Sequence, residues 1–421
     1  MKIAIVVSEF PALSETFILS HVTSLLDRGA EVTVLAHRPR AESTVHPEIE
    51  TYGLREKTWY SGQPARRWPR VAGLAQRLAS AAFRRRLPAA LAALDAGRWG
   101  RTAANLDLLY AATGALPASR RFDIVHCHFG DCALRGAFLR EAGLIEGRLV
   151  ATLHGADDIV GVEPLRRLFE LGDAFLPISE FWSRKLADMG CPQEKLRVHH
   201  VGIDTRRFAF KERARAPGEA LRLATVCRLA EKKGLEVAIQ AIAMLREQRP
   251  DVPLGFSIVG DGPLEGALRA QARELGLTDS VAFLGPRPRD EVVRVLEDAH
   301  AFFHPSVTAS NGEREGIPVS IMEAMASGLP VVATWHSGIP ELVEDGVSGL
   351  LAPEHDVGAL ARHLAALADD PALLPRMGKA GRAAVEKGFD QESLDRALWG
   401  FYEELLGAEP SEAAPPMKIA R

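Results

Sequence analysis

The stretch Glu315-Gly-Ile-Pro-Val-Ser-Ile-Met-Glu323, continued by Ala324-Met-Ala-Ser-Gly-Leu-Pro-Val-Val332, says most about how this chain folds. Pro318 favours a helix that begins at residues 317–318, because proline fits the first turn of a helix. Gly316 lets a phosphate approach the backbone, and the helix start offers unpaired N–H groups at the positive end of a dipole. The stretch therefore predicts a diphosphate-binding loop and helix, followed by a buried strand.

Two carboxylates frame this predicted phosphate site. Glu315 directly precedes the helix, and Glu323 lies under two turns inside it. Carboxylate oxygens accept hydrogen bonds from neighbouring sugar hydroxyls, so each glutamate can bind hydroxyls on one side of the phosphate. Two glutamates near a helix start are also common on protein surfaces, so the rest of the chain has to support this interpretation.

Short apolar runs alternate with helical patterns through most of the chain. The runs are apolar throughout, as is typical of parallel strands that are covered on both faces. This alternation predicts an α/β protein with two doubly wound parallel sheets. The expected strands are residues 2–7, 31–36, 123–129, 148–153 and 174–179 in the first half, and 221–227, 254–259, 281–284, 301–304 and 329–334 in the second.

A polar, aperiodic segment over residues 204–220 separates the two halves. We therefore predict a first domain over 1–203, a linker, and a second domain over 221–388. Residues 389–406 form a further predicted helix. The tail over 407–421 is rich in Pro, Ala and Glu, a composition typical of a mobile segment.

Composition narrows the function classes. The 421 residues carry a formal net charge of −4 and are 47% hydrophobic, which is typical of a soluble globular protein and gives no global signal for nucleic-acid binding. The first apolar run is too short for a signal peptide, and none approaches the ~20 residues of a membrane span. The four cysteines form no C-x-x-C pair or zinc-ligand spacing. We therefore expect a cytoplasmic protein that contacts membranes peripherally at most.

Basic and glycine residues follow the first two strands of the second half. Arg228 and Lys233 come after strand 221–227, at the edge where open parallel sheets bind ligands, and Gly260 follows strand 254–259. A guanidinium fork and an ammonium group suit a leaving diphosphate. Basic residues at a helix start are also common on surfaces, and Lys232 can replace Lys233 in this interpretation.

Polar residues also follow three strands of the first half. His128 ends strand 123–129, His154 and Asp157 follow strand 148–153, and Ser14 and Glu15 follow the first strand. We expect them on one rim, where the histidines have either a structural or a functional role. The loop after the first strand contains no glycine, which argues against a nicotinamide-binding fingerprint.

Residues 66–86, called the basic segment below, interrupt the strand–helix alternation. Their pattern predicts one basic amphipathic helix that carries Trp68 and Phe83. Such a helix can lie on an anionic membrane surface, or it can be a solvated face that packs its apolar side on the first sheet.

Together these motifs resemble the retaining glycosyltransferases with the GT-B fold (glycosyl transferases group 1), particularly the bacterial branch that makes colanic-acid-type exopolysaccharides. The resemblance covers the chain from Ser8 to about Tyr402. It is carried by the stretch quoted first, by Arg228 to Gly234, and by Ser337-Gly-Ile-Pro-Glu341, Val201-Gly-Ile-Asp204 and Ser14-Glu-Thr-Phe-Ile18. Many relatives have a Gly-Gly loop where this chain has Ser14-Glu15, so the phosphate contacts from that side stay open.

The resemblance implies an acceptor-binding first domain, a nucleotide-sugar-binding second domain, a cleft between them, and a last helix that crosses back to the first domain. It implies that Arg228 and Lys233 hold the diphosphate of a UDP- or GDP-sugar. The implied catalytic residues are Arg228, Lys233, His154 and Glu315, of which Glu315 would hold the donor sugar. The implied donor-binding residues are Gly260, Leu284, Gly316, Ile317, Pro318 and Glu323, with Glu323 at the ribose and Leu284 near the base. His154 would lie over the transferring sugar, and Ser14, Glu15, His128 and Asp157 would face the acceptor.

The resemblance further implies that no metal or other cofactor is needed, and the chain has no Asp-x-Asp candidate. We expect transfer with retention to a glycan hydroxyl, on a lipid-linked acceptor in exopolysaccharide or lipopolysaccharide biosynthesis. A sugar-nucleotide epimerase, a phosphorylase of the same architecture and a non-catalytic sugar-nucleotide-binding component of an assembly complex remain alternatives. Base, sugar, acceptor, linkage and oligomeric state stay open at this point.

Overall fold

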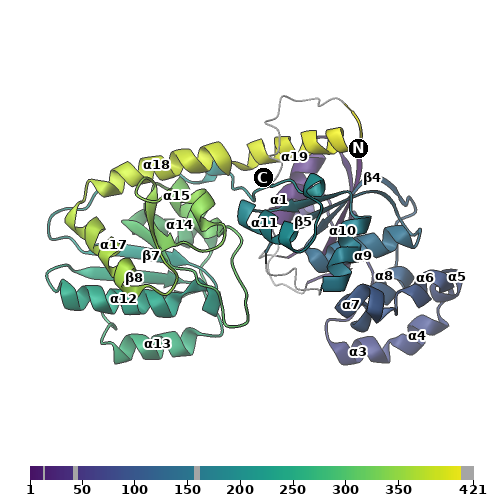
Figure 1. Ribbon diagram of the computed structural model, residues 1–421, viewed down its shortest axis with the longest axis horizontal. Helices are drawn as coiled ribbons and strands as arrows, with labels where there is room; N and C mark the ends of the chain where they lie inside the picture. The colour runs from purple at the N-terminus through teal and green to yellow at the C-terminus, as the bar shows by residue number, and fades with distance from the viewer. Residues whose placement is uncertain (13–14, 41–45, 156–161, 409–421) are drawn as a thin grey trace. The chain divides into compact units, whose positions relative to one another are not determined.

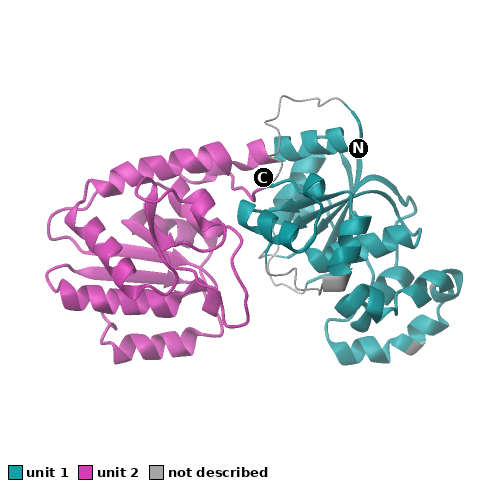
Figure 2. Ribbon diagram, in the orientation of Figure 1, with its two compact units in different colours: residues 1–199, 395–421 teal, residues 200–394 magenta. Residues whose placement is uncertain are grey.

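The computed structural model describes residues 1–12, 15–40, 46–155 and 162–408. The chain forms two compact units, residues 1–199 with 395–421 (unit 1) and residues 200–394 (unit 2), shown in Figure 2. The predicted linker over 204–220 lies within unit 2, where the buried Arg213 donates hydrogen bonds to Ala299 O and Ser327 O at 3.2 and 2.6 Å. Most of the predicted tail falls outside the described residues.

Unit 1 is built on a six-stranded parallel sheet with the strand order β3-β2-β1-β4-β5-β6 (Figure 1). Side chains of β1 alternate between two apolar cores, with Ile3 and Ile5 in one and Ala4 and Val6 in the other. The strands are β1 Lys2–Glu9, β2 Glu31–Arg38, β3 Thr58–Tyr60, β4 Arg121–His128, β5 Glu146–Leu153 and β6 Ala174–Pro177.

Helices cover both faces of this sheet. The core with Ile3 and Ile5 contains side chains of α1 (Thr16–Asp27) and of the part of α19 (Gln391–Leu405) that belongs to unit 1. The opposite core takes in α8 (Asp107–Thr113), α9 (Gly130–Glu141) and α10 (Val162–Leu171). The remaining helices of unit 1 are α2 Glu48–Thr51, α3 Arg67–Ala72, α4 Leu74–Ala79, α5 Ala81–Arg85, α6 Leu87–Ala92, α7 Ala96–Ala104, α11 Glu180–Asp188 and the 3-10 turn η2 Gln193–Lys195.

Unit 2 repeats the plan with the order β12-β11-β10-β7-β8-β9. Its strands are β7 Leu221–Val226, β8 Leu254–Val259, β9 Val281–Gly285, β10 Ala301–His304, β11 Val331–Thr334 and β12 Gly349–Ala352. Its helices are α12 Leu235–Gln248, α13 Glu265–Glu274, α14 Arg289–Asp298, α15 Val319–Ala326, α16 Ile339–Leu342, α17 Val357–Asp369 and α18 Leu373–Gly388, with the 3-10 turns η3 Thr205–Arg207 and η4 Glu231–Lys233.

All ten predicted strands are present and pair in parallel, so the predicted fold class is confirmed. Two strands were missed, β3 (Thr58–Tyr60) and β12 (Gly349–Ala352), and each lies at one edge of its sheet. Strand β3 has three residues, too few to show a pattern, and β12 (Gly-Leu-Leu-Ala) lacks the β-branched and aromatic residues that favour strands.

The prediction of one helix over the basic segment is wrong. The structure has the separate helices α3, α4 and α5 there, interrupted at Gly73 and Ser80. Ser80 has an extended backbone with ψ of 150°, and its hydroxyl accepts a hydrogen bond from the N–H of Phe83 at 3.0 Å. That bond begins a new helix, because serine competes with the helical backbone and favours helix starts.

Candidate functional site

The loops after β7 and β10 meet where the strand order of unit 2 reverses. Open parallel sheets bind ligands at this point, beside the carboxyl ends of the strands. The first loop contains η4 and Gly234, and the second contains Glu315. Lys233 Nζ lies 2.9 Å from Glu315 Oε2, so the structure brings two predicted site residues together as an ion pair. We call Arg228, Lys233 and Glu315 the charged rim of unit 2.

Gly234 makes this approach possible. Its φ is +65°, and a Cβ atom there would lie 1.8 Å from the carbonyl oxygen of Pro305. Any other residue would push the two loops apart and move Lys233 away from Glu315. The glycine is therefore required by the geometry of the charged rim itself.

The backbone of Glu315 is held in place by two residues of the loop after β11. Glu315 is 7% exposed, its N–H donates to His336 Nε2 at 3.0 Å, and its carbonyl accepts from Ser337 Oγ at 2.6 Å. His336 Nδ1 lies 2.7 Å from a carboxylate oxygen of Glu354, whose other oxygen accepts the N–H of Thr308. Since Nε2 accepts a hydrogen bond, the proton of His336 is on Nδ1 and faces Glu354.

His336, Glu354 and Thr308 were missed by the sequence analysis. His336 comes two residues after the predicted strand 329–334, so the signal that marked the histidines of the first half was present here too. Glu354 follows β12, a strand that was not predicted. Burial lowers the pKa of His336, against the opposing effect of Glu354, which is consistent with a neutral imidazole.

Helix α15 begins at Val319, next to the predicted start at residues 317–318. Ile317 is 5% exposed and Pro318 is the N-cap, without a side-chain cap. Within the described part of the chain, the N–H groups of Gly316 and Val319 have no protein acceptor. This end of the helix can therefore receive an anion.

The other donor-side residues lie on neighbouring loops. Gly260 has φ of +125°, and a Cβ there would lie 2.0 Å from Cys227 O, in the loop that begins the charged rim. The N–H of Gly260 donates to Gly285 O at 3.0 Å, beside the half-buried Leu284. Arg228 is exposed and forms no ion pair with the described residues.

Glu323 lies on α15 and is half-buried. Burial raises the pKa of its carboxyl group, and Arg289 opposes this shift. A carboxylate that is desolvated in this way can gain strongly from hydroxyl donors of a ligand.

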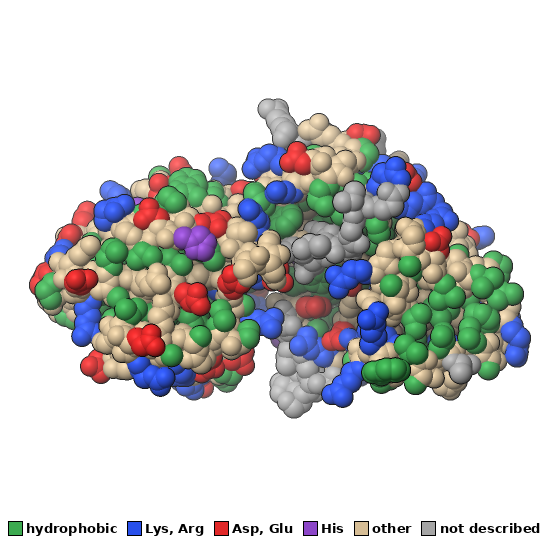
Figure 3. Space-filling model, turned by 60° about the horizontal axis from the view of Figure 1, so that its bottom comes forward, with side chains coloured by type: hydrophobic (Ala, Val, Ile, Leu, Met, Phe, Trp, Pro, Cys, Tyr) green, Lys and Arg blue, Asp and Glu red, His purple; other side chains and the backbone are tan. Residues whose placement is uncertain are grey.

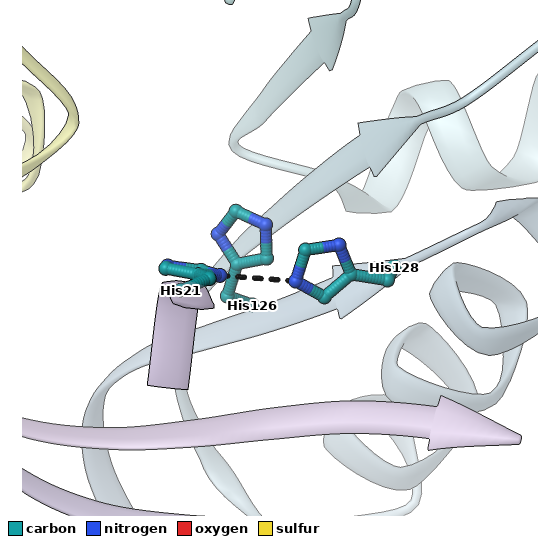
Figure 4. A group of neighbouring side chains, drawn as sticks. All are labelled: His21, His126 and His128. Carbon is teal, nitrogen blue, oxygen red and sulfur yellow. Dashed lines mark hydrogen bonds between the residues drawn. The ribbon is translucent and has the colours of Figure 1, made fainter. Parts of the chain in front are cut away.

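Unit 1 has histidines at the corresponding point of its sheet. His128 ends β4, and His21 lies on α1, the helix that follows β1. His21 Nδ1 lies 3.0 Å from His128 Nε2, a contact drawn in Figure 4, and His128 Nδ1 lies 3.0 Å from His154 Nε2. The structure thus brings His128 and His154 together, as expected. Glu15 is the N-cap of α1, whereas Ser14 and Asp157 lie outside the described residues.

Further buried groups continue this contact on the other side of His21. Tyr402 Oη lies 3.2 Å from His21 Nε2 and 2.6 Å from His126 Nδ1, and His126 Nε2 lies 2.8 Å from Thr152 Oγ1. His21, His126 and Tyr402 were not predicted as site residues. The sequence signals that could have found two of them are a histidine on the apolar face of α1, which is His21, and a further histidine on β4, which is His126. We call the complete series the histidine chain: Thr152, His126, Tyr402, His21, His128 and His154.

The imidazoles of the histidine chain are neutral. Burial, together with neighbouring histidines, holds the pKa of His21, His126 and His128 well below the usual value and that of His154 at about 3. Three of them, His21, His126 and His128, have ring nitrogens within 4.8 Å of one another, a spacing that could hold a metal ion.

Comparison with known proteins covers nearly the whole chain. Residues 14–207 match the model for Glycosyltransferase Family 4, and residues 206–384 match that for Glycosyl transferases group 1. The putative colanic acid biosynthesis glycosyltransferase WcaL of Escherichia coli is 39% identical over 407 residues, 94% of this chain and 98% of that protein. The amylovoran biosynthesis glycosyltransferase AmsK of Erwinia amylovora is 40% identical over 411 residues, 96% and 100% of the two chains.

A solved structure shows the same fold at low identity. Anabaena Alr3699/HepE, crystallised in complex with UDP, superposes with a TM-score of 0.67 at 19% identity over 96% of this chain and 100% of that chain. The GT-B fold inferred from the sequence is therefore confirmed. With near-complete coverage by relatives at about 40% identity, the chain belongs to the glycosyl transferases group 1 family and is a glycosyltransferase.

Proposed function

We propose that this enzyme transfers a sugar, with retention and without a metal ion, from a nucleotide-diphosphate sugar to a hydroxyl of a lipid-linked glycan. The observation that carries the proposal is the Lys233–Glu315 pair, 2.9 Å apart at the point where the strand order of unit 2 reverses. The relatives named for colanic acid and amylovoran biosynthesis support a place in exopolysaccharide biosynthesis. Lipopolysaccharide biosynthesis is the second setting we consider.

The roles follow from charge and position in unit 2. Lys233 and Arg228 neutralise the negative charge that grows on the diphosphate as the bond to the sugar breaks. The N-terminus of α15, with the backbone of Gly316 and Ile317, binds the phosphate oxygens. Glu315 accepts from a hydroxyl of the donor sugar, and its ion pair with Lys233 holds its carboxylate in place for this purpose.

The rest of the donor is held by Glu323 and the glycine loops. Glu323 accepts from the ribose hydroxyls, a gain in hydrogen bonding that offsets its unfavourable burial. Gly260 and Leu284 contribute backbone atoms next to the base. The UDP in the Alr3699/HepE complex supports uracil as the base of the donor, with guanine as the alternative.

The proposed retaining step needs no enzymatic nucleophile. A phosphate oxygen of the leaving diphosphate assists removal of the acceptor proton on the face from which the diphosphate departs. The charged rim stabilises the diphosphate during this step. In unit 1, His154 is neutral and binds the transferring sugar by hydrogen bonding, and Glu15 faces the acceptor. The expected acceptor contact of His128 is not part of this proposal, because His128 is buried and both of its ring nitrogens are bonded to His21 and His154.

The donor is tested by a thermal-shift screen of UDP-, GDP- and ADP-sugars. A ligand that binds only the native state raises the apparent stability by about 2.7 kcal/mol at a concentration of 100 times its Kd. We expect a uridine or guanosine donor to raise the Tm, and inorganic phosphate to have little effect. No shift with any nucleotide sugar would contradict the proposal.

The stereochemistry is tested by proton NMR of the product formed with that donor. The account predicts an anomeric configuration identical to that of the donor, and activity that survives EDTA. An inverted anomer would contradict the proposed retaining step, and loss of activity in EDTA with rescue by magnesium would contradict metal independence. Conversion of the donor without any acceptor would favour the epimerase alternative.

A lipid-linked acceptor lies in a membrane, so the enzyme has to work at the membrane surface. In this proposal, the basic segment and the helices after it bind that surface. Among the described residues, no helix is long and apolar enough to cross a membrane. Figure 3 shows apolar side chains gathered at the right of that view, with basic side chains among them. The large apolar side chains exposed in this region are Trp68, Val71, Leu78, Leu87, Leu91 and Leu94.

The arginines of the basic segment fall into two groups. Arg77 donates to Ser61 O at 2.7 Å, Arg86 donates to Ala112 O at 2.9 Å, and Arg70 pairs with Asp107, so these three hold the fold together. The exposed arginines, which can meet anionic headgroups at about 1 kcal/mol each, are Arg66, Arg67, Arg84 and Arg85.

The membrane proposal is tested by co-sedimentation with vesicles that contain or lack phosphatidylglycerol. R84E/R85E should weaken binding to anionic vesicles at least ~30-fold, since two headgroup attractions of about 1 kcal/mol each are lost. R362E/R376E, an equal charge change at exposed sites of unit 2, should bind like the parent. Equal binding of the parent to neutral and anionic vesicles would contradict the proposal.

A further inference from the structure

The histidine chain is an unbroken series of hydrogen bonds that ends at His154. Each of its five contacts measures between 2.6 and 3.2 Å. Its groups come from β4, β5, α1 and α19 and from the residue after β5, and all except the half-buried His154 are buried. Proton positions along such a series are coupled, because each group's bond on one side fixes its bond on the other.

The coupling follows from the chemistry of neutral imidazole. A neutral ring has one N–H donor and one bare nitrogen, and a phenol donates one proton and accepts another. Each contact of the chain must contain one proton. If Tyr402 accepted from both of its neighbours, its own buried hydroxyl proton would have no acceptor, so two arrangements remain. Either all protons point from Thr152 towards His154, or all point the other way.

The Thr152 end selects between these two arrangements. Thr152 is 4% exposed, and among the described residues His126 is the one hydrogen-bonding partner of its hydroxyl. If His126 donated to Thr152, the hydroxyl proton would be buried without an acceptor, at a cost of about 1–3 kcal/mol. The hydroxyl therefore donates to His126 Nε2, and the proton of His126 lies on Nδ1.

The position of the proton on His126 determines the proton positions of all the following groups. His126 Nδ1–H donates to Tyr402 Oη, and Tyr402 O–H donates to His21 Nε2. His21 then donates from Nδ1 to His128 Nε2, and His128 donates from Nδ1 to His154 Nε2. His154 is left with its own proton on Nδ1.

We propose that Tyr402 and the three histidines behind His154 are positioning residues, which fix His154 as a hydrogen-bond donor through Nδ1–H. This inference rests on the proposed function, in which His154 binds the transferring sugar. It narrows that role: His154 donates to an oxygen of the sugar and does not accept the proton of the acceptor hydroxyl. The depressed pKa values of the buried histidines agree with neutral rings throughout.

A metal ion among His21, His126 and His128 is the competing explanation. The hydrogen bonds favour the chain, because each ring nitrogen of these three residues already has a partner at hydrogen-bonding distance. A bound ion would take nitrogens away from Tyr402 or from a neighbouring histidine. Elemental analysis of the purified protein separates the two explanations, and one equivalent of tightly bound zinc would overturn ours.

The direct test is nitrogen-15 NMR of the histidine rings, which distinguishes the two tautomers without any substrate. In the parent we expect the Nδ1–H tautomer at His21, His126, His128 and His154. Y402F removes only the hydroxyl that joins the two parts of the chain, and should produce a mixture of tautomers at His154. Y110F is the matched control, because Tyr110 is buried and donates to Arg70 O outside the chain.

A second pair of variants acts at the other end. T152V removes the hydroxyl that selects the arrangement and should change the His154 spectrum, whereas T152S keeps the hydroxyl and should restore the parent spectrum. Because the spectrum does not depend on turnover, failure of this proposal is distinguishable from failure of the proposed function. An unchanged His154 spectrum in folded Y402F and T152V would overturn the proposal.

Kinetics test whether the transfer step uses this tautomer. With the donor identified by the thermal-shift screen, Y402F and T152V should lower kcat about three- to ten-fold, with a smaller change in KM, and Y110F and T152S should not. Altered spectra with unchanged kcat would overturn the positioning role.

Discussion

The two sheets of this enzyme have the same strand order but opposite chemistry at the point where that order reverses. Numbered within each unit, both run 3-2-1-4-5-6. In unit 2, this point holds an ion pair between Lys233 and Glu315. In unit 1, the corresponding point holds a contact between two neutral imidazoles, His21 and His128.

This difference separates what topology determines from what side chains determine. Parallel strands and their helices bring the same loops together in both units, so the place of a ligand site is inherited from the fold. The side chains then decide which ligand suits it. We propose that fixed charges suit a diphosphate in unit 2 and that directional, uncharged hydrogen bonds suit sugar hydroxyls in unit 1.

The largest expected effect comes from removing the positive charge of unit 2. R228A/K233A should lower kcat about 100- to 1,000-fold, with a smaller rise in the KM for the donor, because the charge on the diphosphate is greatest in the transition state. Steady-state kinetics give both constants. R249A, which breaks an exposed ion pair with Asp251 and Asp369, is the matched control and should keep parent activity. A raised KM with an unchanged kcat would mean that the pair only binds the ground state.

The next effect concerns Glu323. E323Q should weaken binding of the nucleotide sugar about 10- to 100-fold, since a charge-assisted hydrogen bond contributes roughly 1.5–3 kcal/mol. Calorimetric titration measures this, and an unchanged Kd would remove Glu323 from the site. The folded-state pKa of Glu323 is raised, so its ionised form costs stability above that pKa. The Tm of ligand-free E323Q should therefore exceed that of the parent at pH 8.

A third effect is a difference in acid stability between the units. Histidines whose folded pKa is depressed stay neutral while the unfolded chain takes up protons below pH ~6.5, so stability falls with pH by up to about 1.4 kcal/mol per unit for each histidine. Among the described residues, unit 1 has more of them: His21, His37, His126, His128 and His154, against His300, His304 and His336 in unit 2.

Unit 1 should therefore open first as the pH falls from 7.5 to 5.5. Brief thermolysin digestion followed by mass spectrometry locates the early cuts. We expect them to move into residues 1–199 at the lower pH. Early cuts confined to residues 200–394 would show that the buried histidines do not control acid stability.

The smallest effect separates the two neighbouring lysines. Lys232 Nζ lies 4.0 Å from Glu315 and is more exposed than Lys233, at 30% against 14%. A loose, partly exposed ion pair contributes about 0–1 kcal/mol, so K232A should change kcat less than ~5-fold. K233A alone provides the comparison, and an equal loss in both variants would show that either lysine can serve the diphosphate.

The sequence predicted those parts of the fold and site that depend on neighbouring residues along the chain. Strand 221–227 is apolar apart from Arg222 and Thr225, and Arg228 follows it directly, so both the element and its site residue could be identified. Strand β12 (Gly-Leu-Leu-Ala) is apolar but has no β-branched or aromatic residue, so it was missed, and Glu354, which follows it, was missed with it. The prediction of one helix over the basic segment was wrong although the segment has helical periodicity. The hydroxyl of Ser80 ends one helix and begins the next.

Contacts between distant residues could not be predicted in this way. Tyr402 reaches His126 across 276 positions, and Glu315 depends on His336 in a different loop. His21 looks like one polar residue on the apolar face of α1 until the sheet brings His128 beside it. Such partners follow from the tertiary fold, which residue spacing alone does not give.

The central claim is that the charged rim of unit 2 binds the diphosphate of the donor. Hydrogen–deuterium exchange of the parent with and without UDP or GDP tests it most directly, because it locates the protected backbone. The account predicts slower exchange in residues 228–235 and 315–323, and a smaller effect in R228A/K233A when both proteins are compared at a nucleotide concentration near the Kd of the parent. Protection confined to unit 1, or protection of the same size in the variant, would contradict it.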